Sequence, residues 1–510
     1  MDLAKLIQGI GLHHAAGPPP EGVRVSDLTE DSRTAVTGSL FIARAGTAQD
    51  GKRFVGDARR AGACAVVTDD ASLDFHGLTV LVADDVTQAT AEIAERFFGG
   101  PTQLLKLIGV TGTNGKSTVA HVAHHLLNHA GQRCGLIGTI EIDDGREVAP
   151  ASMTTPPALE LSRTLATMHE HGCGWCAMEV SSHALDQKRA AGLSFDVGVF
   201  TNLTGDHQDY HVSMEAYAAA KRRLFGLVVS GGTAVVNADD PASEGMVEDF
   251  DGPVIRCRAD DERDADAWVE LHDESPAGSE LTLHGPWGEA EVLLKLHGRH
   301  NAMNALQAVA ASYVVGLPAG AVVPALNAVR PPAGRLERVE IEAVGVPLPA
   351  VYVDFAHSDD ALRAALEGLR PVVPEGARLW AVFGCGGEKD RSKRPRMGSI
   401  AAELADRVIV TSDNPRSEQP SEIIDEVLTG ISDRDRRRVD VQARRERAVL
   451  AAVRGARPND VVLLAGKGHE TTQEIAGADG TVIAVPFDDR EHARAALLAR
   501  LREAQVAGPA

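Results

Sequence analysis

The sequence predicts an α/β protein of three domains, and three observations support this prediction. The chain has 510 residues, a length that accommodates about three domains of roughly 100–200 residues each. Short apolar runs alternate with helical stretches, the pattern of βαβ units around a mostly parallel sheet. Breaks rich in Gly and Pro lie at 99–101 and 331–334. We therefore expect domains at 1–101, 102–333 and 334–510.

Composition argues against several classes of protein. Acidic residues outnumber basic ones by 72 to 51, for a net charge of −21, which disfavours nucleic acid as a partner because phosphate contacts need clustered Lys and Arg. No apolar run reaches the roughly 18 residues that span a bilayer. The first 14 residues are too mixed for a secretion signal. We expect a cytoplasmic monomer without membrane insertion.

Two local patterns have ordinary structural explanations. The basic run at 434–438 is flanked by Asp, and we interpret it as a solvated loop or helix face. Cys173 and Cys176 have the spacing of a redox motif, but they precede an apolar run instead of opening a helix. We therefore expect no redox role for this pair.

The first hundred residues contain short runs such as SLFIARAG and CAVVTDD, and we expect a small α/β domain there. In the second part, LLKLIGV predicts a buried strand, followed by a Gly-rich loop and a helix that Gly131 would cap. Strand-like runs follow at CAMEV, DVGVFTNL and TAVVNADD. The polar stretch at 257–290 suggests a peripheral insertion of short strands.

In the third part, four apolar runs each end in a polar loop: VYVDFAH, LWAVFGCGG, RVIVTSDNPR and DVVLLAGKGHE. Ligands of open α/β sheets bind beyond the carboxyl ends of the strands. These four loops are therefore where the third domain should carry its chemistry.

The Gly-rich loop at 111–118, TGTNGKST, is the strongest chemical signal. Successive backbone N–H groups at a helix N-terminus bind phosphate, a Lys adds positive charge, and the next hydroxyl can ligate Mg²⁺. Val110 stands where the strict pattern has Gly or Ala. We expect ATP to bind through Gly112, Thr113, Asn114, Gly115, Lys116, Ser117 and Thr118.

This octet resembles the phosphate loop of the Mur ligases, which join an amino acid to a peptidoglycan precursor, and the resemblance extends through nearly the whole chain. It implies domains for UDP, for ATP and for the incoming amino acid. These would be a UDP-sugar-binding domain, a central P-loop parallel-sheet ATPase domain and a C-terminal Rossmann-like domain. Among Mur ligases, the chain is most similar to members that add a diamino acid to UDP-N-acetylmuramoyl-L-alanyl-D-glutamate.

The resemblance implies two Mg²⁺ ions, held by Ser117, Glu179, His207 and Lys221. Glu179 ends an apolar strand in EVSSHAL, and a carboxylate there can coordinate Mg²⁺. Lys221 matches a lysine that the family carbamylates, which converts a cation into an anionic oxygen ligand. From its own surroundings, Lys221 would be predicted to lie on the surface of a helix.

Further residues match the family's substrate contacts. Asn301 and Asn304 fall on one helix face that would reach adenine, Arg335 would contact the γ-phosphate, and Asp354 and His357 would lie near the ribose. Phe355 and Ser358 replace the usual Tyr and Thr. The UDP-muramoyl dipeptide would be held by Ser32, Thr47, Ala48, Gln49, Met153, Thr154, Thr155, Ser181, Gln187 and Arg189.

The sequence Asp413-Asn414-Pro415-Arg416 is typical of members that add meso-2,6-diaminopimelate. The guanidinium of Arg416 can pair bidentately with the distal carboxylate of diaminopimelate, and it would repel the ammonium of lysine. Glu470 can receive the distal amino group, and Gly466 lies in the same loop. Lys389 stands where an Arg is common, which leaves the LL isomer open, and Arg391 is an alternative contact.

The implied reaction is ATP-driven peptide-bond formation through an acyl phosphate. The nearest alternatives are a lysine-adding ligase, the next ligase of the pathway and folylpolyglutamate synthase. Two other classes are a P-loop NTPase acting as a motor or switch, and a non-catalytic UDP-sugar-binding protein. An amino-acid requirement for nucleotide turnover would separate a ligase from both.

Overall fold

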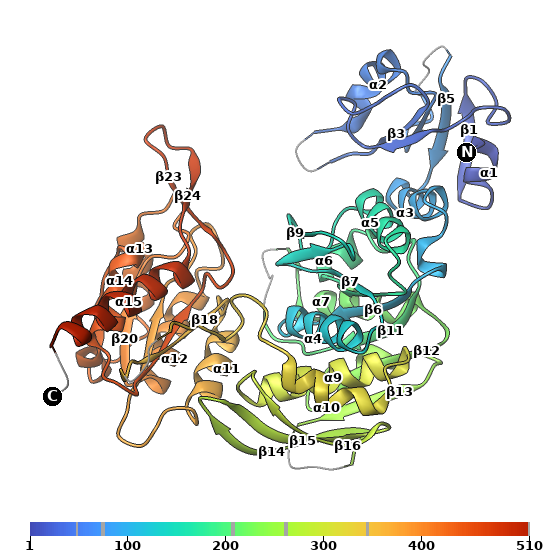
Figure 1. The fold of residues 1–510 in the computed structure, drawn as a ribbon. Helices are drawn as coiled ribbons and strands as arrows, with labels where there is room; N and C mark the ends of the chain where they lie inside the picture. The colour runs from blue at the N-terminus through green and yellow to red at the C-terminus, as the bar shows by residue number, and fades with distance from the viewer. Residues whose placement is uncertain (47–48, 73–76, 206–209, 260–263, 343–345, 508–510) are drawn as a thin grey trace.

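The computed structural model describes residues 1–46, 49–72, 77–205, 210–259, 264–342 and 346–507. In these segments the chain forms three α/β bodies in series, each built around its own sheet (Figure 1). The amino-terminal and carboxy-terminal bodies lie on different sides of the central one (Figure 1). Each body has its own buried apolar clusters, so the predicted three-part α/β architecture is confirmed.

The amino-terminal sheet has the order β1-β5-β4-β3-β2. Its strands are parallel except for β1, which pairs antiparallel with β5. The helix α3 begins after Asp85, whose carboxylate accepts from the backbone N–H of Gln88 at 2.9 Å. The elements are α1 (Leu3–Ile7), β1 (Leu12–Ala16), β2 (Asp27–Thr29), β3 (Ser39–Ala43), α2 (Val55–Ala61), β4 (Ala65–Thr68), β5 (Thr79–Ala83) and α3 (Val86–Phe97).

The central sheet has the order β16-β15-β14-β13-β12-β11-β6-β10-β7-β8-β9 in the described part of the chain. Its middle strands are parallel, and β8, β9, β15 and β16 pair antiparallel at its two edges. The strands are β6 (Lys106–Thr111), β7 (Cys134–Ile137), β8 (Glu141–Asp143), β9 (Val148–Pro150), β10 (Trp175–Glu179), β11 (Phe195–Phe200), β12 (Val228–Asn237), β13 (Val254–Arg258), β14 (Ala267–Ser275), β15 (Gly278–Gly285) and β16 (Gly288–Leu294).

The short strands expected at 257–290 are present as β14 to β16, but they are part of the central sheet and not a separate insertion. Leu281, Leu283 and Val292 belong to the same apolar core as the helices α4 (Lys116–His129) and α9 (Arg299–Val314). Half of the ten acidic residues at 257–290 precede β14 in the sequence, and the other half lie in the three strands. Buried and exposed positions alternate along β16, so only one face of that strand is buried. The helices of this body are α4 (Lys116–His129), α5 (Ala158–Glu170), α6 (Ser182–Asp186), α7 (Met214–Arg222), α8 (Ser243–Val247), α9 (Arg299–Val314) and α10 (Val322–Ala328).

The carboxy-terminal sheet has the order β17-β18-β22-β19-β20-β21, parallel except for β17. Apolar clusters cover both of its faces, so the four predicted runs are buried strands. Because the strands are parallel, the loops that follow β18, β19, β20 and β22 meet at one edge. The elements are β17 (Glu337–Arg338), β18 (Ala350–Asp354), α11 (Asp359–Leu369), β19 (Leu379–Phe383), α12 (Lys393–Leu404), β20 (Arg407–Val410), α13 (Pro420–Leu428), β21 (Val439–Val441), α14 (Arg445–Gly455), β22 (Val461–Ala465), β23 (Thr472–Ala476), β24 (Val482–Pro486) and α15 (Asp489–Ala507).

The minor patterns have the expected structural roles. Cys173 and Cys176 are buried thiols, and Cys176 lies within the strand β10. In the basic run at 434–438, Asp435–Arg438 form a short 3-10 helix in which Arg436 and Arg437 are exposed and Arg438 is half-buried. No helix in the described segments has both the length and the apolar character needed to cross a bilayer.

Candidate active site

The phosphate loop connects β6 to α4, and its backbone is shaped by two glycines. Gly112 has φ 148° and Gly115 has φ 85°. A Cβ on Gly112 would lie 1.8 Å from Oγ1 of Thr201, so only glycine fits there. The neighbouring segment after β11 braces the loop: Asn202 accepts from the backbone N–H of Thr113 at 2.8 Å and, through Oδ1, from that of Asn114 at 2.9 Å. The predicted strand, loop and helix order is therefore present.

Two lysines converge on the carbonyl oxygen of Gly112. Lys116 Nζ donates to it at 2.9 Å and to the carbonyl of Thr113 at 2.8 Å. Lys221 Nζ donates to the same oxygen at 2.7 Å and lies 4.1 Å from the ring centre of Tyr217. Lys221 is only 1% exposed, so the surface position predicted from its own surroundings is wrong. The helix α7 turns this side chain inward, because the adjacent phosphate loop supplies a buried acceptor for it.

Arg335 reaches the phosphate loop from the start of the third body. Its Nη2 donates to Oγ of Ser117 at 3.2 Å, and its guanidinium lies 4.8 Å from the ring centre of Phe355. A cavity beside it is lined by part of the phosphate loop and by Asn301, Asn304, Asp354 and His357. Asn304 Nδ2 donates to Asn301 Oδ1 at 3.1 Å. The structure thus brings the predicted nucleotide residues of two bodies to one cavity.

Asp354 ends β18 inside this cavity and holds the turn that leads to His357. Its carboxylate accepts from the backbone N–H groups of Leu336 at 2.7 Å and Ala356 at 2.8 Å. Burial raises its pKa, and the nearby charge of Arg335 opposes that shift. The backbone bonds fix the carboxylate next to Arg335.

Glu179 lies at the end of β10 and is 1% exposed. Its carboxylate accepts from the backbone N–H of Thr139 at 2.7 Å and lies 3.0 Å from the Thr139 hydroxyl. That hydroxyl is also 3.0 Å from Oγ1 of Thr154. Thr155 donates to the Glu179 carbonyl at 2.9 Å, and Arg189 Nη1 donates to the Thr155 carbonyl at 3.0 Å. Five residues predicted for the metal and for the muramoyl dipeptide therefore share one network, namely Glu179, Thr154, Thr155, Arg189 and Gln187, which accepts from Arg189 at 2.6 Å.

The donor set around Ser117 fits Mg²⁺. Ser117 and Glu179 line one small cavity together with His121 and Glu141. A hydroxyl and carboxylates supply the oxygen ligands that Mg²⁺ prefers, and nucleotide phosphates complete its shell. Within the described segments no group of three or more His, Cys, Asp or Glu side chains could hold a metal ion without such a ligand. An uncarbamylated Lys221 is a donor to Gly112 and not a ligand.

The remaining residues predicted for the UDP-muramoyl dipeptide and the metal are only partly described. Thr47, Ala48 and His207 lie outside the described residues. Ser32 is half-buried, Gln49 and Met153 are exposed, and the Ser181 hydroxyl caps α6. Burial lowers the pKa of Arg189, and the charge of Arg44 on the amino-terminal body lowers it further. Lys188, next to Arg189, pairs with Asp85 of the amino-terminal body at 2.5 Å, so that body lies close to the dipeptide residues.

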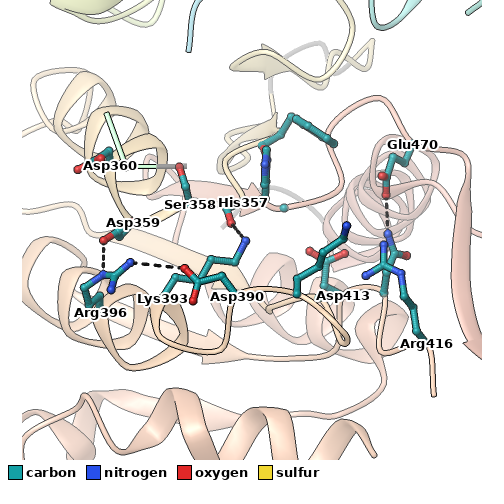
Figure 2. A pocket seen from close by; sticks show the side chains of 16 residues that line it. His357, Ser358, Asp359, Asp360, Asp390, Lys393, Arg396, Asp413, Arg416 and Glu470 are labelled. Carbon is teal, nitrogen blue, oxygen red and sulfur yellow. Dashed lines mark hydrogen bonds and ion pairs between the residues drawn. The ribbon is translucent and has the colours of Figure 1, made fainter. Parts of the chain in front are cut away.

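A second cavity opens at the carboxyl edge of the third sheet (Figure 2). Glu470 and Arg416 lie on one side of it, Lys393 and Arg396 on the other, and Asp413 between them (Figure 2). Its volume is about 450 Å³. Six of the seven residues predicted for the amino acid line it, namely Lys389, Asp413, Asn414, Arg416, Gly466 and Glu470, and Pro415 lies between two of them.

Arg416 is held in a strained backbone conformation with φ 53°. Its Nη1 donates to the Gly387 carbonyl at 2.7 Å, and its Nε lies 2.8 Å from the carboxylate of Glu474. Burial raises the pKa of Asp413, while the charges of Arg445 and Lys467 oppose that shift. The guanidinium of Arg416 is thus held through Nε and Nη1 in the wall of the cavity.

The structure adds residues that the sequence argument missed and removes one that it allowed. Lys393 lines the amino-acid cavity and donates to the His357 carbonyl at 2.7 Å. Lys467 is buried beneath the cavity. The sequence could have indicated it, because it lies in the GKGHE loop between the predicted residues Gly466 and Glu470. Arg391 does not substitute for Lys389: its side chain is 63% exposed and pairs with Glu426, because α13 offers it a carboxylate on the outer surface.

Comparison with known proteins agrees with this geometry. Residues 110–312 match the Mur ligase middle domain, and residues 334–468 match the Mur ligase, glutamate ligase domain. The UDP-N-acetylmuramoyl-L-alanyl-D-glutamate--2,6-diaminopimelate ligase of Chlorobium phaeobacteroides is 41% identical over 506 residues, which cover 98% of this chain and 97% of that protein. The protein of the same name from Synechococcus elongatus is 43% identical over 496 residues, covering 93% and 94%.

Solved structures show the same relationship. One UDP-N-acetylmuramoyl-L-alanyl-D-glutamate--2,6-diaminopimelate ligase superposes with a TM-score of 0.70 at 31% identity, covering 98% of this chain and 99% of that one. MurF ligase from Thermotoga maritima, solved in complex with ADP, has a TM-score of 0.62 at 16% identity and covers 94% and 98%. The second likeness concerns the fold alone.

Proposed function

Because the chain belongs to the Mur ligase family, we propose that it is an ATP-dependent ligase that joins 2,6-diaminopimelate to the D-glutamate of UDP-N-acetylmuramoyl-L-alanyl-D-glutamate. The reaction is a step of peptidoglycan synthesis. Relatives that carry this activity in their names align with nearly the whole chain at 41% and 43% identity.

The strongest structural support for this proposal is the wall shared by the two cavities. The nucleotide cavity and the amino-acid cavity share Phe355, His357 and Asp360 in their walls. An amine in the second cavity is therefore adjacent to an acyl phosphate formed at the mouth of the first. A P-loop switch would need the nucleotide cavity only.

The chemistry proceeds in two steps. The γ-carboxylate of D-glutamate attacks the γ-phosphate of ATP, giving an acyl phosphate and ADP. The amine of diaminopimelate then attacks the acyl carbon, the new amide forms, and inorganic phosphate leaves. The protein contributes by positioning the reactants and by neutralising charge that develops on phosphate oxygens.

Lys116 and Arg335 are the positively charged side chains that we expect to contact the phosphates of ATP. Lys116 can exchange its two carbonyl acceptors on the loop for phosphate oxygens. Arg335 can exchange the Ser117 hydroxyl for the γ-phosphate, which releases that hydroxyl as a metal ligand. Closure of the third body over ATP would complete this exchange. Bound Mg²⁺ adds charge neutralisation on phosphate oxygens, and we assign it to Ser117, Glu179, carbamylated Lys221 and His207.

The side chains of the third body account for the choice of amino acid. Arg416 offers a guanidinium to the distal carboxylate, and Glu470 offers a carboxylate to the distal ammonium. We propose the meso isomer, because the Asp413–Arg416 motif is typical of enzymes that add it. Lys389 keeps the positive charge of the usual arginine without its planar fork.

ADP release by the purified enzyme tests the proposal. The reactions contain ATP, the UDP-muramoyl dipeptide and one of meso-diaminopimelate, LL-diaminopimelate or L-lysine. We expect turnover with meso-diaminopimelate and roughly a hundredfold or more lower kcat/KM with L-lysine, the difference that an unpaired charged contact produces. Turnover with lysine alone would refute the specificity argument. ADP release that needs no amino acid would instead favour an NTPase.

A further inference from the structure

Lys467 is a fully buried charged group with no part in the chemistry described above. Its side chain is 0% exposed, and it stands between Gly466 and Glu470 in the loop after β22. Its Nζ donates to Asn414 Oδ1 at 2.8 Å and to Glu470 Oε2 at 2.6 Å, and it lies 4.0 Å from Asp413 Oδ1. A buried ammonium persists only where its donors find such partners. These three partners are all residues of the amino-acid cavity.

The contacts of Lys467 determine which way the Asn414 amide points. Asn414 Oδ1 accepts from Lys467 and also from the backbone N–H of Glu474 at 3.0 Å. The amide nitrogen must therefore point the other way, where it donates to Glu470 Oε2 at 3.0 Å. Two donors on one oxygen make the flipped amide unfavourable, because it would set Nδ2 against an ammonium and an N–H.

The same contacts orient Glu470. Lys467 and Asn414 both bind Oε2 of its carboxylate. The other oxygen, Oε1, stays outside this network, and Glu470 lines the cavity beside Arg416 (Figure 2). One carboxylate oxygen is thus anchored from below while the second is presented to the ligand.

Building on the proposed ligase function, we propose that Lys467 is a positioning residue for amino-acid recognition. It acts from beneath the cavity by locking the Asn414 amide and the Glu470 carboxylate into the arrangement that receives the ammonium of diaminopimelate. The substrate does not touch it, since the side chain has no exposed surface. Its effect should therefore appear in the binding of the amino acid and not in that of the other two substrates.

Steady-state kinetics of Lys467→Met in the full chain test this role. We expect KM for meso-diaminopimelate to rise about ten- to hundredfold, the range for losing hydrogen bonds to a charged group. KM for ATP and for the UDP-muramoyl dipeptide should change by less than about threefold, and kcat should fall less than KM rises. An unchanged KM for diaminopimelate overturns the proposal, as does a parallel rise in KM for all three substrates.

Asp460→Asn is the matched control for lost stability. Asp460 precedes the same strand β22 at its opposite end, has a side chain that is also 0% exposed, and accepts from Arg378 N at 2.9 Å and Trp380 Nε1 at 3.0 Å. Its substitution should lower the melting temperature without a selective rise in KM for diaminopimelate. If Asp460→Asn raises that KM as much as Lys467→Met does, the effect is structural and the proposal fails.

A double variant keeps the test decisive if Lys467→Met leaves unpaired carboxylates that prevent folding. Lys467→Met with Glu470→Gln removes both members of the ion pair. Adding Lys467→Met to Glu470→Gln should raise KM for diaminopimelate by a smaller factor than adding it to the wild type, because only the contact with Asn414 remains to be lost. An equal factor in both backgrounds would mean that Lys467 acts independently of Glu470, against the proposal. Wild-type enzyme that fails to turn over diaminopimelate would refute the ligase function itself, a distinct result.

Discussion

The phosphate loop and the amino-acid cavity hold their charged groups in opposite ways. At the loop, Lys116 and Lys221 donate to the protein's own carbonyl groups, and Arg335 donates to the hydroxyl of Ser117. In the amino-acid cavity, a buried lysine anchors Asn414 and Glu470 from behind and leaves their other side to the cavity.

From this contrast we infer which site must change when its ligand binds. The cations at the phosphate loop have to exchange protein oxygens for phosphate oxygens, so this site is completed by ATP and metal. The amino-acid cavity is held in its binding arrangement before the ligand enters, which lowers the ordering cost of recognition. Variants at Lys221, Arg416 and His297 test this contrast.

Lys221→Ala tests whether the phosphate-loop site depends on converting a cation into a ligand. If carbamylated Lys221 helps to hold Mg²⁺, the alanine variant should lose about 10²–10³-fold in kcat, as expected for one stabilising group at the reacting phosphate. A short-chain carboxylate such as acetate should restore part of the activity by supplying an anionic oxygen, whereas bicarbonate should not. ADP release measures both effects.

The matched control is Lys295→Ala, which removes an exposed lysine just after β16. Its activity should equal that of the wild type. Unchanged activity in Lys221→Ala would remove the carbamate from the mechanism. It would also mean that the phosphate-loop site functions without conversion of Lys221 into a metal ligand. The phosphate-loop site would then be preformed like the amino-acid cavity.

Arg416→Ala tests the preformed side of the comparison. Without the guanidinium, kcat/KM for meso-diaminopimelate should fall about 10–100-fold, because a charge-assisted pair contributes about 1.5–3 kcal/mol. The value for L-lysine should stay constant or rise, since the repulsive charge is gone. Arg391 is an exposed arginine that pairs with Glu426. As a control, Arg391→Ala should change neither kcat/KM value by more than about twofold. An equal loss for both amino acids would show that Arg416 does not discriminate between them.

His297→Gln tests the contact between the central body, which carries the phosphate loop, and the third body, which carries the amino-acid cavity. His297 is 4% exposed, and its Nε2 lies 3.3 Å from the hydroxyl of Tyr352 on β18. Burial lowers the pKa of His297 from 6.5 to about 4. Between those values the unfolded chain binds the proton first, so stability falls as the pH drops from about 6.5 to about 4.

Over this pH interval the free energy of unfolding should decrease in both proteins. The decrease should be about 1–2 kcal/mol smaller in His297→Gln than in the wild type, after allowance for partial solvent screening. Urea unfolding at pH 7 and pH 4.5 measures the difference. His13→Gln, on an exposed position of β1, should follow the wild type. If the free energy of unfolding changes with pH to the same extent in the wild type and in His297→Gln, then His297 does not cause the loss of stability in acid.

Much of the architecture was open to prediction from the sequence. The Gly-rich octet, the alternating runs and the four strand-end loops are local patterns, and the parallel order of β18, β22, β19 and β20 brings their loops together. The stretch at 257–290 contains the short strands that were expected there, but its polar composition did not reveal that Leu281, Leu283 and Val292 join the central core. Composition alone does not show which side chains of a strand are buried.

The phosphate loop and the Asp413–Arg416 motif could be identified from the sequence, since a short contiguous segment carries each of them. The burial of Lys221 against Gly112, 109 residues away, and the contact of Lys467 with Asn414, 53 residues away, follow from the tertiary structure. It also decided that the two cavities share a wall at His357. Whether a lysine is solvated or buried depends on the acceptors that distant segments bring to it, and local sequence does not record them.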